Sequence, residues 1–559
     1  MALSREIYQA LEDIVGKRNI SEDIGVCETY RSIPSQSSAH YGPSKTWTPL
    51  PQAVILPKTT EEVQNIVRIC NKYKIEFKAS TTFWSTMGHI GSDYAVQLDL
   101  RRMKSVTIDT KNMTAVIEPF AIAATVQAEA MKVGLNVSIP GVGCSSSTLA
   151  STAAWAGFGP GTIFMGSTPE NLLGAEWVLP NGEVLRTGSH GSGDGWFCGE
   201  GPGPSQRGML RGIFGTAGTS GVCTKMAVRL HPWPGPKDFP TRGTIPAYRA
   251  EFGDNLKAYT LCFPDWKAWA RSVQFFHESD VLYLGHRQFS MFGRNLKAAM
   301  LRIISSADLQ LSDLETVLAD PEVQKQNESM KLDYQIVIAG MTKRDMEYKE
   351  KAIEYILEQT GGWKNEMVLE KELHDFVLLY MTRLGHKNLN YVMCGAYEGT
   401  FGLSSNVWKT IQVIEEAVEI KRNWELEHTH IAATGGDSAM GSTSGIGGGG
   451  ATGWEFFTNF DSYEDESVEG TNKFMDGNQE FHNKYSFGPD FCRWNSDVRH
   501  MNGYNYTQEE HDALYINNPQ PWVYAYQYKM RQAINPNNLC GSYFRTLTPS
   551  KLEEAEQAK

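Results

Sequence analysis

A histidine pair and a late arginine are the side chains best suited to acid–base or anion chemistry. His428 and His430 are two residues apart in a strand-like run. Side chains two apart in a strand share a face, so both imidazoles would lie on one side. An imidazole titrates near neutral pH, which makes His430 a candidate general base. The pair could also be ordinary polar strand residues, or bind a metal with Glu427 or Asp437, but we predict no metal site. Arg493 offers a planar guanidinium that suits a carboxylate or phenolate, although a surface role stays open.

Two glycine-rich stretches lack the spacing of nucleotide-binding motifs. The stretch 441–453 has no lysine and no G-x-x-x-x-G-K-[ST] order, so a Walker-type phosphate loop is not expected there. We expect it to be a flap beside the active site or a loop against a cofactor. The run GFGPG at 157–161 is not a dinucleotide fingerprint, because no helix is expected to follow Pro160 and Gly161 directly. A Rossmann nicotinamide site is therefore not predicted.

The elements that must position these groups begin with a β-α-β unit. A short apolar run at 53–56 predicts a strand, and Thr59 with Glu62 has the spacing of a capping box that opens a helix. Residues 75–79 predict the returning strand, followed by a loop at 80–94. Alternating runs at 105–109 and 114–118 predict one hairpin, and those at 175–179 and 183–187 predict another around an Asn-Gly turn.

A proline cluster at 232–236 marks a predicted domain boundary. Longer helical patterns follow at 345–359 and 406–424, with strand-like runs at 334–338 and 389–394 between them. We predict an N-terminal segment over 1–45, a first domain over 46–236 and a second α+β domain over 237–500. The last residues, 501–559, are predicted to return to the first domain.

Composition limits the class of protein. The chain has 559 residues, of which 41% are hydrophobic and 21% charged, as in a globular protein rather than a disordered or fibrous one. Its net charge of −12 argues against nucleic acid or an anionic membrane as partner. Nine scattered cysteines without a C-x-x-C pair indicate reduced thiols. With no signal-peptide pattern and no long apolar run, we predict a cytoplasmic protein that could form a homo-oligomer.

Three segments together resemble the vanillyl-alcohol oxidase / p-cresol methylhydroxylase family. They are AVILPKTTEEVQNIVRICNKYKIEF from position 53, AEWVLPNGEVLRTG from 175 and RGMLRGIFGTAGTSGVCTKMAVRLHPWP from 207, while INPNNL at 534–539 resembles the family's closing Asp-Pro-Asn-Gly signature. The resemblance implies an α+β fold. It would comprise a two-subdomain FAD-binding domain of the p-cresol methylhydroxylase type and an α+β substrate (cap) domain with an antiparallel sheet. The cofactor implied is FAD.

The resemblance also implies which residues contact FAD. Backbone N–H groups and hydroxyls of a tight loop can bind a buried diphosphate, although this loop has no glycine before Gly88. The implied residues are Ser80, Thr81, Thr82, Phe83, Trp84 and Ser85 in that loop, Pro140, Gly141, Thr148 and Ser151 in a second stretch, and Gly221 with Val222 in a third. Each segment has an alternative interpretation. The first could be a polar surface loop, the second a Gly/Ser-rich surface loop and the third an ordinary strand start.

Departures from the family pattern bear on the substrate. Met87 and Cys492 stand where the family has tyrosines, but Arg493 matches its anion-binding arginine. The strand at 454–459 has no histidine, so non-covalent FAD is expected. The resemblance implies an oxidoreductase that removes hydride from a small, aromatic alcohol or alkylphenol and passes electrons to oxygen or a redox protein. A 2-hydroxy-acid dehydrogenase, a non-redox FAD transferase and a member that has lost FAD remain alternatives.

Overall fold

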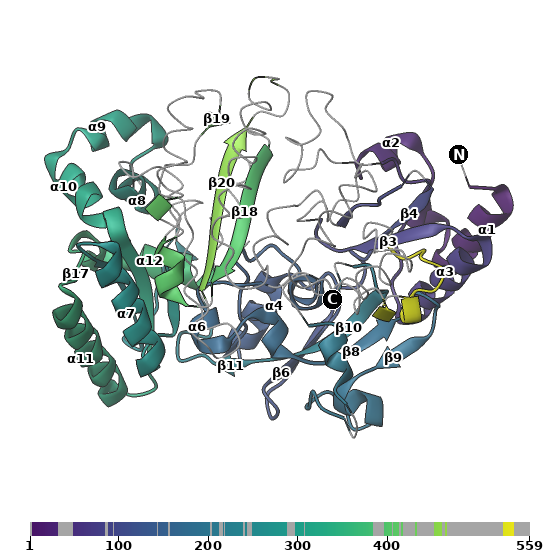
Figure 1. Cartoon of the computed structure of the whole chain (residues 1–559), viewed down its shortest axis with the longest axis horizontal. Helices are drawn as coiled ribbons and strands as arrows, with labels where there is room; N and C mark the ends of the chain where they lie inside the picture. The colour runs from purple at the N-terminus through teal and green to yellow at the C-terminus, as the bar shows by residue number, and fades with distance from the viewer. Residues whose placement is uncertain are drawn as a thin grey trace, which may run out of the picture.

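The computed structural model arranges the chain as two sheets of one domain beside the sheet and helices of another (Figure 1). It describes residues 3–31, 49–83, 88–92, 94–141, 143–154, 157–201, 204–211, 216, 218–238, 241–242, 249–287, 297–306, 308–383, 396–404, 406–412, 415–416, 431–432, 452–460, 464, 466, 529–530 and 532–541. The N-terminal helices α1 and α3 lie at one end of the molecule, and α11 lies at the other.

The first sheet is built from the predicted β-α-β unit. Its strand order is β1-β2-β4-β3, and both β2 and β3 run parallel to β4. The strands are β1 (Ile20–Ser21), β2 (Val54–Ile55), β3 (Glu76–Ser80) and β4 (Ala95–Asp99), and the helices are α1 (Arg5–Val15), α2 (Ile24–Glu28) and α3 (Thr60–Tyr73). Helices α1 and α3 bury apolar stripes in a core that they share with these strands.

The start of α3 differs in one detail from the prediction. Thr59 is the N-cap and accepts a bond from the Glu62 N–H at 3.1 Å, as expected. The Glu62 carboxylate, however, accepts from the N–H of Lys58 at 2.6 Å rather than from that of Thr59. The reciprocal capping box is therefore wrong, because the carboxylate reaches the donor one residue earlier and lies 3.9 Å from Arg102.

The second sheet contains both predicted hairpins. Its antiparallel order is β5-β6-β10-β8-β9. The strands are β5 (Val106–Asp109), β6 (Thr114–Ile117), β8 (Leu172–Val178), β9 (Val184–Arg186) and β10 (Val222–Arg229), and the helices are α4 (Ala123–Met131), α5 (Thr148–Ala153) and α6 (Thr162–Met165). Strands β7 (Leu135–Asn136) and β11 (His231–Pro232) pair separately.

Helix α6 corrects a second expectation, because it follows Pro160 and Gly161 directly. The Thr162 hydroxyl accepts a bond from the Gly159 N–H at 2.9 Å, and the Pro160 carbonyl accepts one from the Gly285 N–H at 2.8 Å. These contacts support a helix start that lacks a side-chain cap. The helix has only four residues, so it is not the long helix of a dinucleotide-binding unit.

The cap domain has a four-stranded antiparallel sheet with helices on both faces. Its order is β15-β16-β14-β17, from β14 (Leu256–Cys262), β15 (Leu284–His286), β16 (Asp333–Ala339) and β17 (Trp363–Lys364). One face packs in a core with α7 (Trp266–Ser279) and α11 (Lys343–Thr360). The other packs in a core with α8 (Lys297–Ser305), α10 (Pro321–Ser329) and α12 (Lys371–Arg383), near α9 (Leu314–Leu318).

A further antiparallel sheet stands between the two domains in Figure 1. It pairs β18 (Ala396–Ser404) and β19 (Ile431–Ala432) with β20 (Thr452–Phe460), which includes the predicted strand at 454–459. Strands β12 (Thr241–Arg242) and β13 (Arg249–Ala250) form a short ribbon.

Buried polar contacts join the cap to the first domain. The Gln127 amide donates to the Thr382 carbonyl at 2.9 Å, and the Asn136 amide donates to the Tyr283 hydroxyl at 3.0 Å. One apolar core is continuous across this joint. The two domains therefore pack as a unit rather than as independent bodies.

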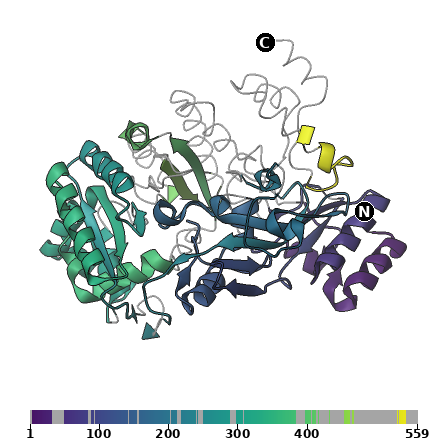
Figure 2. The same cartoon turned by 90° about the horizontal axis from the view of Figure 1, so that it is seen from below.

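The chain returns late to the first sheet. The N–H of Phe77 in β3 donates to the Leu539 carbonyl at 2.9 Å, and the Gly541 N–H donates to the Phe77 carbonyl at 3.0 Å. Both views show this yellow segment beside the N-terminal part of the molecule (Figures 1 and 2). Residues 535–541 thus extend the outer edge of β3, next to the loop that follows that strand.

Candidate functional site

The loop after β3 is closed by its own polar groups. The Ser80 hydroxyl donates to the Gly88 carbonyl, and the Gln97 amide donates to the same carbonyl at 3.2 Å and to that of Lys78 at 3.0 Å. Because its proton is used in this contact, Ser80 shapes the loop. Thr81, Thr82 and Phe83 are half-buried beside it, and Trp84 and Ser85 lie outside the described residues.

Aromatic packing stabilises an unusual backbone conformation in this loop. Phe83 has φ of 51°, a left-handed conformation that glycine adopts more easily than phenylalanine. Its ring lies 5.4 Å from the ring of Tyr30 and 5.3 Å from that of His89, centroid to centroid. The Tyr30 hydroxyl in turn donates to the buried carboxylate of Asp99 at 2.7 Å. Ring contacts thus support a loop that lacks glycines at its start.

The second predicted stretch lies directly against this loop. The Ser147 N–H donates to the Thr82 hydroxyl oxygen at 3.3 Å. An accepted bond does not use the hydroxyl proton, so Thr82 can still donate to a phosphate oxygen. Ser147 is also the N-cap of α5, and its own hydroxyl donates to the Pro119 carbonyl at 2.6 Å.

The predicted residues of this stretch are all buried. The Gly141 N–H donates to the Phe158 carbonyl at 2.5 Å, and the Ser151 hydroxyl donates to the Thr148 carbonyl at 3.0 Å. The Thr148 hydroxyl has no hydrogen-bond partner within the described part of the chain. A buried hydroxyl of this kind costs free energy unless a ligand or another group satisfies it. Pro140 closes the turn by accepting from the Gly143 N–H at 2.9 Å.

Gly221 and Val222 have a structural explanation of their own. Gly221 has φ of 107°, and a Cβ there would clash with the Val178 carbonyl. Val222 begins β10 and packs beside Val178 in the core of the first sheet. These contacts account for both residues as a strand start. Their predicted cofactor contact stays a prediction.

A turn at 216–219 connects α5, β3 and the C-terminal segment. The Thr216 N–H donates to the Ala153 carbonyl at 2.9 Å, which ties the turn to α5. The Asn535 amide donates to the carbonyls of Thr219 and Cys540 at 3.5 and 3.2 Å, and its oxygen accepts from the Leu539 N–H at 3.2 Å. An aspartate could not donate these bonds. The asparagine in the closing signature therefore has a defined role.

Sequence reasoning missed Lys78 and Gln97, which lie beneath the loop in β3 and β4. Both side chains are buried, and the Gln97 side-chain oxygen has no hydrogen-bond partner among the described residues. Burial, with Lys78 as a further charge nearby, lowers the pKa of His89 below its usual 6.5. A lysine immediately before a Ser/Thr-rich loop is the signal that could have drawn attention to this position.

Both predicted catalytic residues, Arg493 and His430, lie outside the described residues, as do His428, Met87 and Cys492. Within the described ranges no three His, Cys, Asp or Glu side chains are grouped so as to hold a metal ion. All seven cysteines described there are free thiols. No helix of the described part combines the length and the apolar character that crossing a membrane requires.

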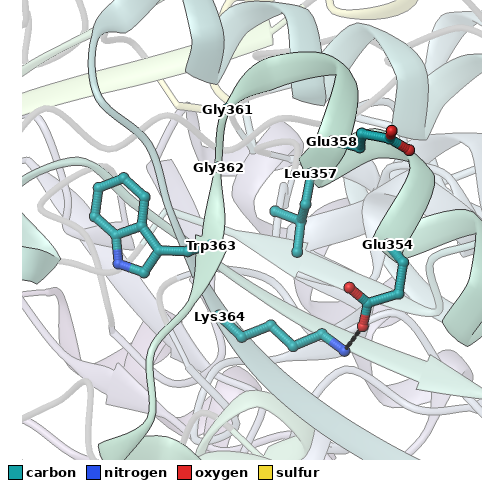
Figure 3. A pocket seen from close by; sticks show the side chains of 7 residues that line it. All are labelled: Glu354, Leu357, Glu358, Gly361, Gly362, Trp363 and Lys364. Carbon is teal, nitrogen blue, oxygen red and sulfur yellow. Dashed lines mark hydrogen bonds and ion pairs between the residues drawn. The ribbon is translucent and has the colours of Figure 1, made fainter.

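A groove of about 510 Å³ lies in the cap, at the end of α11 (Figure 3). It is lined by Glu354, Leu357, Glu358, Gly361, Gly362, Trp363 and Lys364. Its one marked contact is the ion pair between Lys364 and Glu354. Figure 1 places α11 and β17 at the end of the molecule away from β3, so this groove is separate from the candidate site.

Comparison with known proteins identifies the first domain. Residues 51–188 match the FAD binding domain family. This part of the chain is an FAD-binding domain. It contains the loop after β3, the stretch 140–151 and the second hairpin, whereas Gly221 and Val222 lie beyond the matched range. FAD is therefore the cofactor of this domain.

Curated relatives match part of the chain. It is 28% identical to the mitochondrial D-lactate dehydrogenase [cytochrome] of Arabidopsis thaliana over 235 residues, or 41% of this chain and 38% of that protein. It is 29% identical to the 4-cresol dehydrogenase [hydroxylating] flavoprotein subunit of Pseudomonas putida over 243 residues, or 40% and 42%. The chain thus spans about two fifths of the length of the curated relatives it matches.

Solved structures match the whole fold. A p-cresol methylhydroxylase structure with substrate bound superposes with a TM-score of 0.70 at 16% identity, covering 97% of this chain and 96% of the other. An alkyldihydroxyacetonephosphate synthase structure gives 0.62 at 13%, covering 98% and 86%. The predicted α+β fold of the p-cresol methylhydroxylase type is confirmed.

The residues of the candidate site fit the chemistry of FAD. Its diphosphate needs donors and positive charge, and the site offers the hydroxyls of Thr82 and Thr148 and the ammonium group of Lys78.

Proposed function

We propose that this chain is a non-covalent FAD-dependent oxidoreductase of the vanillyl-alcohol oxidase / p-cresol methylhydroxylase family. It would remove hydride from a small aromatic alcohol or alkylphenol. The observation that carries the proposal is the FAD-binding domain within a fold that matches p-cresol methylhydroxylase over 97% of the chain. When bound, FAD supplies the hydride-accepting chemistry, and the protein supplies orientation and charge.

Two residues are assigned roles from the sequence. Arg493 would hold a phenolate or carboxylate, because a planar guanidinium can donate two parallel hydrogen bonds to such an anion. His430 would take the hydroxyl proton of an alcohol substrate, because a neutral imidazole can accept a proton near pH 7. Thr82, Thr148 and the stretch 140–151 would hold the cofactor.

A 2-hydroxy acid is the second candidate substrate. D-lactate dehydrogenase of Arabidopsis thaliana and glycolate oxidase subunit GlcD of Bacillus subtilis are among the relatives. The chain is 28% and 25% identical to them over the matched residues, against 29% for 4-cresol dehydrogenase. A carboxylate would suit Arg493 as well as a phenolate does. The similarity to alkyldihydroxyacetonephosphate synthase also supports a third candidate, a transferase without net redox.

Anaerobic reduction of the bound flavin separates these candidates. The purified protein is mixed without oxygen with a 4-alkylphenol, a benzylic alcohol, D-lactate or glycolate, and the visible flavin absorbance is followed. We expect bleaching with a phenol or benzylic alcohol. Bleaching by hydroxy acids alone would move the substrate class to the second candidate. A flavin that no substrate of either class bleaches would contradict the oxidoreductase proposal.

The role of Arg493 is tested in the same assay. Arg493→Lys keeps the charge but loses the planar fork, so the rate of bleaching per substrate concentration should fall at least about tenfold. The FAD content should stay that of the wild type. Wild-type bleaching by this variant would remove Arg493 from the substrate site.

A further inference from the structure

We propose that Lys78 binds a phosphate of FAD and supplies the positive charge that the glycine-poor loop lacks. The proposal deepens the proposed function and rests on its placement of FAD between the loop after β3 and the stretch 140–151. Lys78 lies in β3, two residues before Ser80, with only 2% of its surface exposed. A lysine is rarely this buried unless an anion or several acceptors surround its ammonium group.

The position of the Lys78 ammonium group follows from its packing against Gly218. A Cβ added to Gly218 would lie 3.0 Å from Nζ and 3.3 Å from Cε, so the end of this side chain lies against the turn at 216–219. Burial, together with the charge of Lys78, also lowers the pKa of His89, which follows the loop. The cation therefore lies beside Gly218, at the end of a side chain that starts two residues before Ser80.

The surroundings of this cation are those of a cofactor site. The Ser147 N–H bonds Thr82 across the gap, and the Thr216 N–H bonds Ala153, so the loop, the turn and the stretch 140–151 meet around one region. The C-terminal segment adds Cys540, whose thiol lies 3.8 Å from the Gly218 carbonyl oxygen. A diphosphate held there would meet both hydroxyl donors and the ammonium group.

The charge of Lys78 could do the work of the glycines that this loop lacks. A glycine-rich loop binds phosphate by directing several backbone N–H groups at it, which requires conformations that other residues rarely adopt. Here Phe83 takes the left-handed conformation only with support from Tyr30 and His89. An ammonium group acts on phosphate as a point charge and needs no such backbone geometry. In a buried site of low dielectric its attraction is strong.

Binding of FAD and of riboflavin by charge-removal variants tests the proposal. Riboflavin carries the same ring system without phosphate. Deflavinated wild type, Lys78→Met and Lys78→Gln are titrated with each flavin, and the flavin fluorescence gives the dissociation constants. We expect both variants to bind FAD about 10- to 100-fold more weakly, as for loss of a charged hydrogen bond, with riboflavin binding unchanged. Two variants of different polarity guard against a failure of one to fold.

The matched control is Lys74→Met. Lys74 is exposed, precedes the same strand and donates to the Asn537 side chain at 3.0 Å, so it shares the local sequence but not the buried position. Its FAD binding should equal that of the wild type. FAD binding by Lys78→Met at the wild-type level, or an equal loss for FAD and riboflavin, would overturn the proposal. Wild-type flavin binding and bleaching test the proposed function separately, so the two failures are distinguishable.

Discussion

Buried polar groups make different kinds of contact in two regions of the molecule. One is the cap, and the other, here called the cofactor region, comprises the loop after β3, the stretch 140–151, Thr216, residues 218–219 and residues 535–541. In the cofactor region buried side chains bond backbone atoms, as when the Asn535 amide donates to the carbonyls of Thr219 and Cys540. In the cap a buried ion pair joins a helix to the sheet, as Lys297 bonds the Asp333 carboxylate at 2.8 Å and also donates to the Met330 carbonyl at 3.1 Å. The first arrangement gives the backbone a particular shape. The second fixes how a helix packs on a sheet.

This difference explains where the sequence was informative. A particular backbone shape requires Gly, Pro, Asn, Ser or Thr at set positions, and such residues leave recognisable motifs. A buried pair such as Lys297 and Asp333 needs only two compatible side chains that meet after folding, and no local pattern announces them. The FAD-binding domain could therefore be predicted in detail, whereas the cap could be predicted only as an α+β domain.

We expect the largest effect from a variant that breaks the buried ion pair between Lys297 and Asp333 in the cap. Lys297 and Asp333 are 5% and 0% exposed at the side chain, so Lys297→Met leaves an uncompensated buried carboxylate. We expect the free energy of unfolding of the protein to fall by about 3–5 kcal/mol. Urea unfolding followed by tryptophan fluorescence measures this, and FAD binding to the folded protein should remain within about twofold of wild type. The comparison fails if FAD affinity falls as steeply as stability.

A surface pair in the same domain is the control for that variant. Lys331 and Glu328 form an ion pair with side chains 40% and 65% exposed. Glu328→Gln should change the free energy of unfolding by less than about 1 kcal/mol, since solvent screens the pair.

The second prediction concerns His231, at the joint between the two regions. Burial, with the charge of Arg229, lowers its pKa from 6.5 to about 4, and its ring lies 2.8 Å from the Asn171 side-chain oxygen. The unfolded state therefore takes up a proton first as pH falls. The resulting loss of stability begins near pH 6.5 and ends near pH 4, and it amounts to about 3 kcal/mol.

His231→Gln keeps a donor for Asn171 but does not titrate in this range. We expect its free energy of unfolding to fall less steeply with acid than that of the wild type when urea curves at pH 7 and pH 4.5 are compared. Equal pH dependence of the two proteins would show that His231 is not held neutral by burial.

The third prediction restores the family's residue in the closing segment. Asn535→Asp removes both donated bonds and directs a carboxylate at two carbonyls, while Asn535 is only 1% exposed. The free energy of unfolding should fall by about 1–3 kcal/mol. Asn537→Asp, at an exposed position of the same turn, should change it by less than about 0.5 kcal/mol. A stabilised Asn535→Asp would mean that the asparagine is an accident rather than a requirement of this turn.

Local rules predicted elements well and contacts between elements poorly. The β-α-β unit and the hairpin at Asn181 and Gly182 follow from periodicity and turn chemistry, which act within a few residues. The error at α6 arose where a tertiary contact, the bond from the Gly285 N–H to the Pro160 carbonyl, supports the helix start. At Glu62 the carboxylate bonds the N–H of Lys58 instead of the neighbouring N–H of Thr59, and it lies 3.9 Å from the distant Arg102. Lys78 was missed because its proposed role depends on its contact with Gly218, which is distant in sequence.

The central proposal is that the protein holds FAD by non-covalent contacts alone. It is tested most directly by acid precipitation of the purified yellow protein, followed by a flavin spectrum of the supernatant and a titration of deflavinated protein with FAD. We predict that all flavin appears in the supernatant and that the deflavinated protein binds FAD again in equal proportion. Flavin that stays with the precipitate, or a colourless protein that binds no added FAD, would contradict the account.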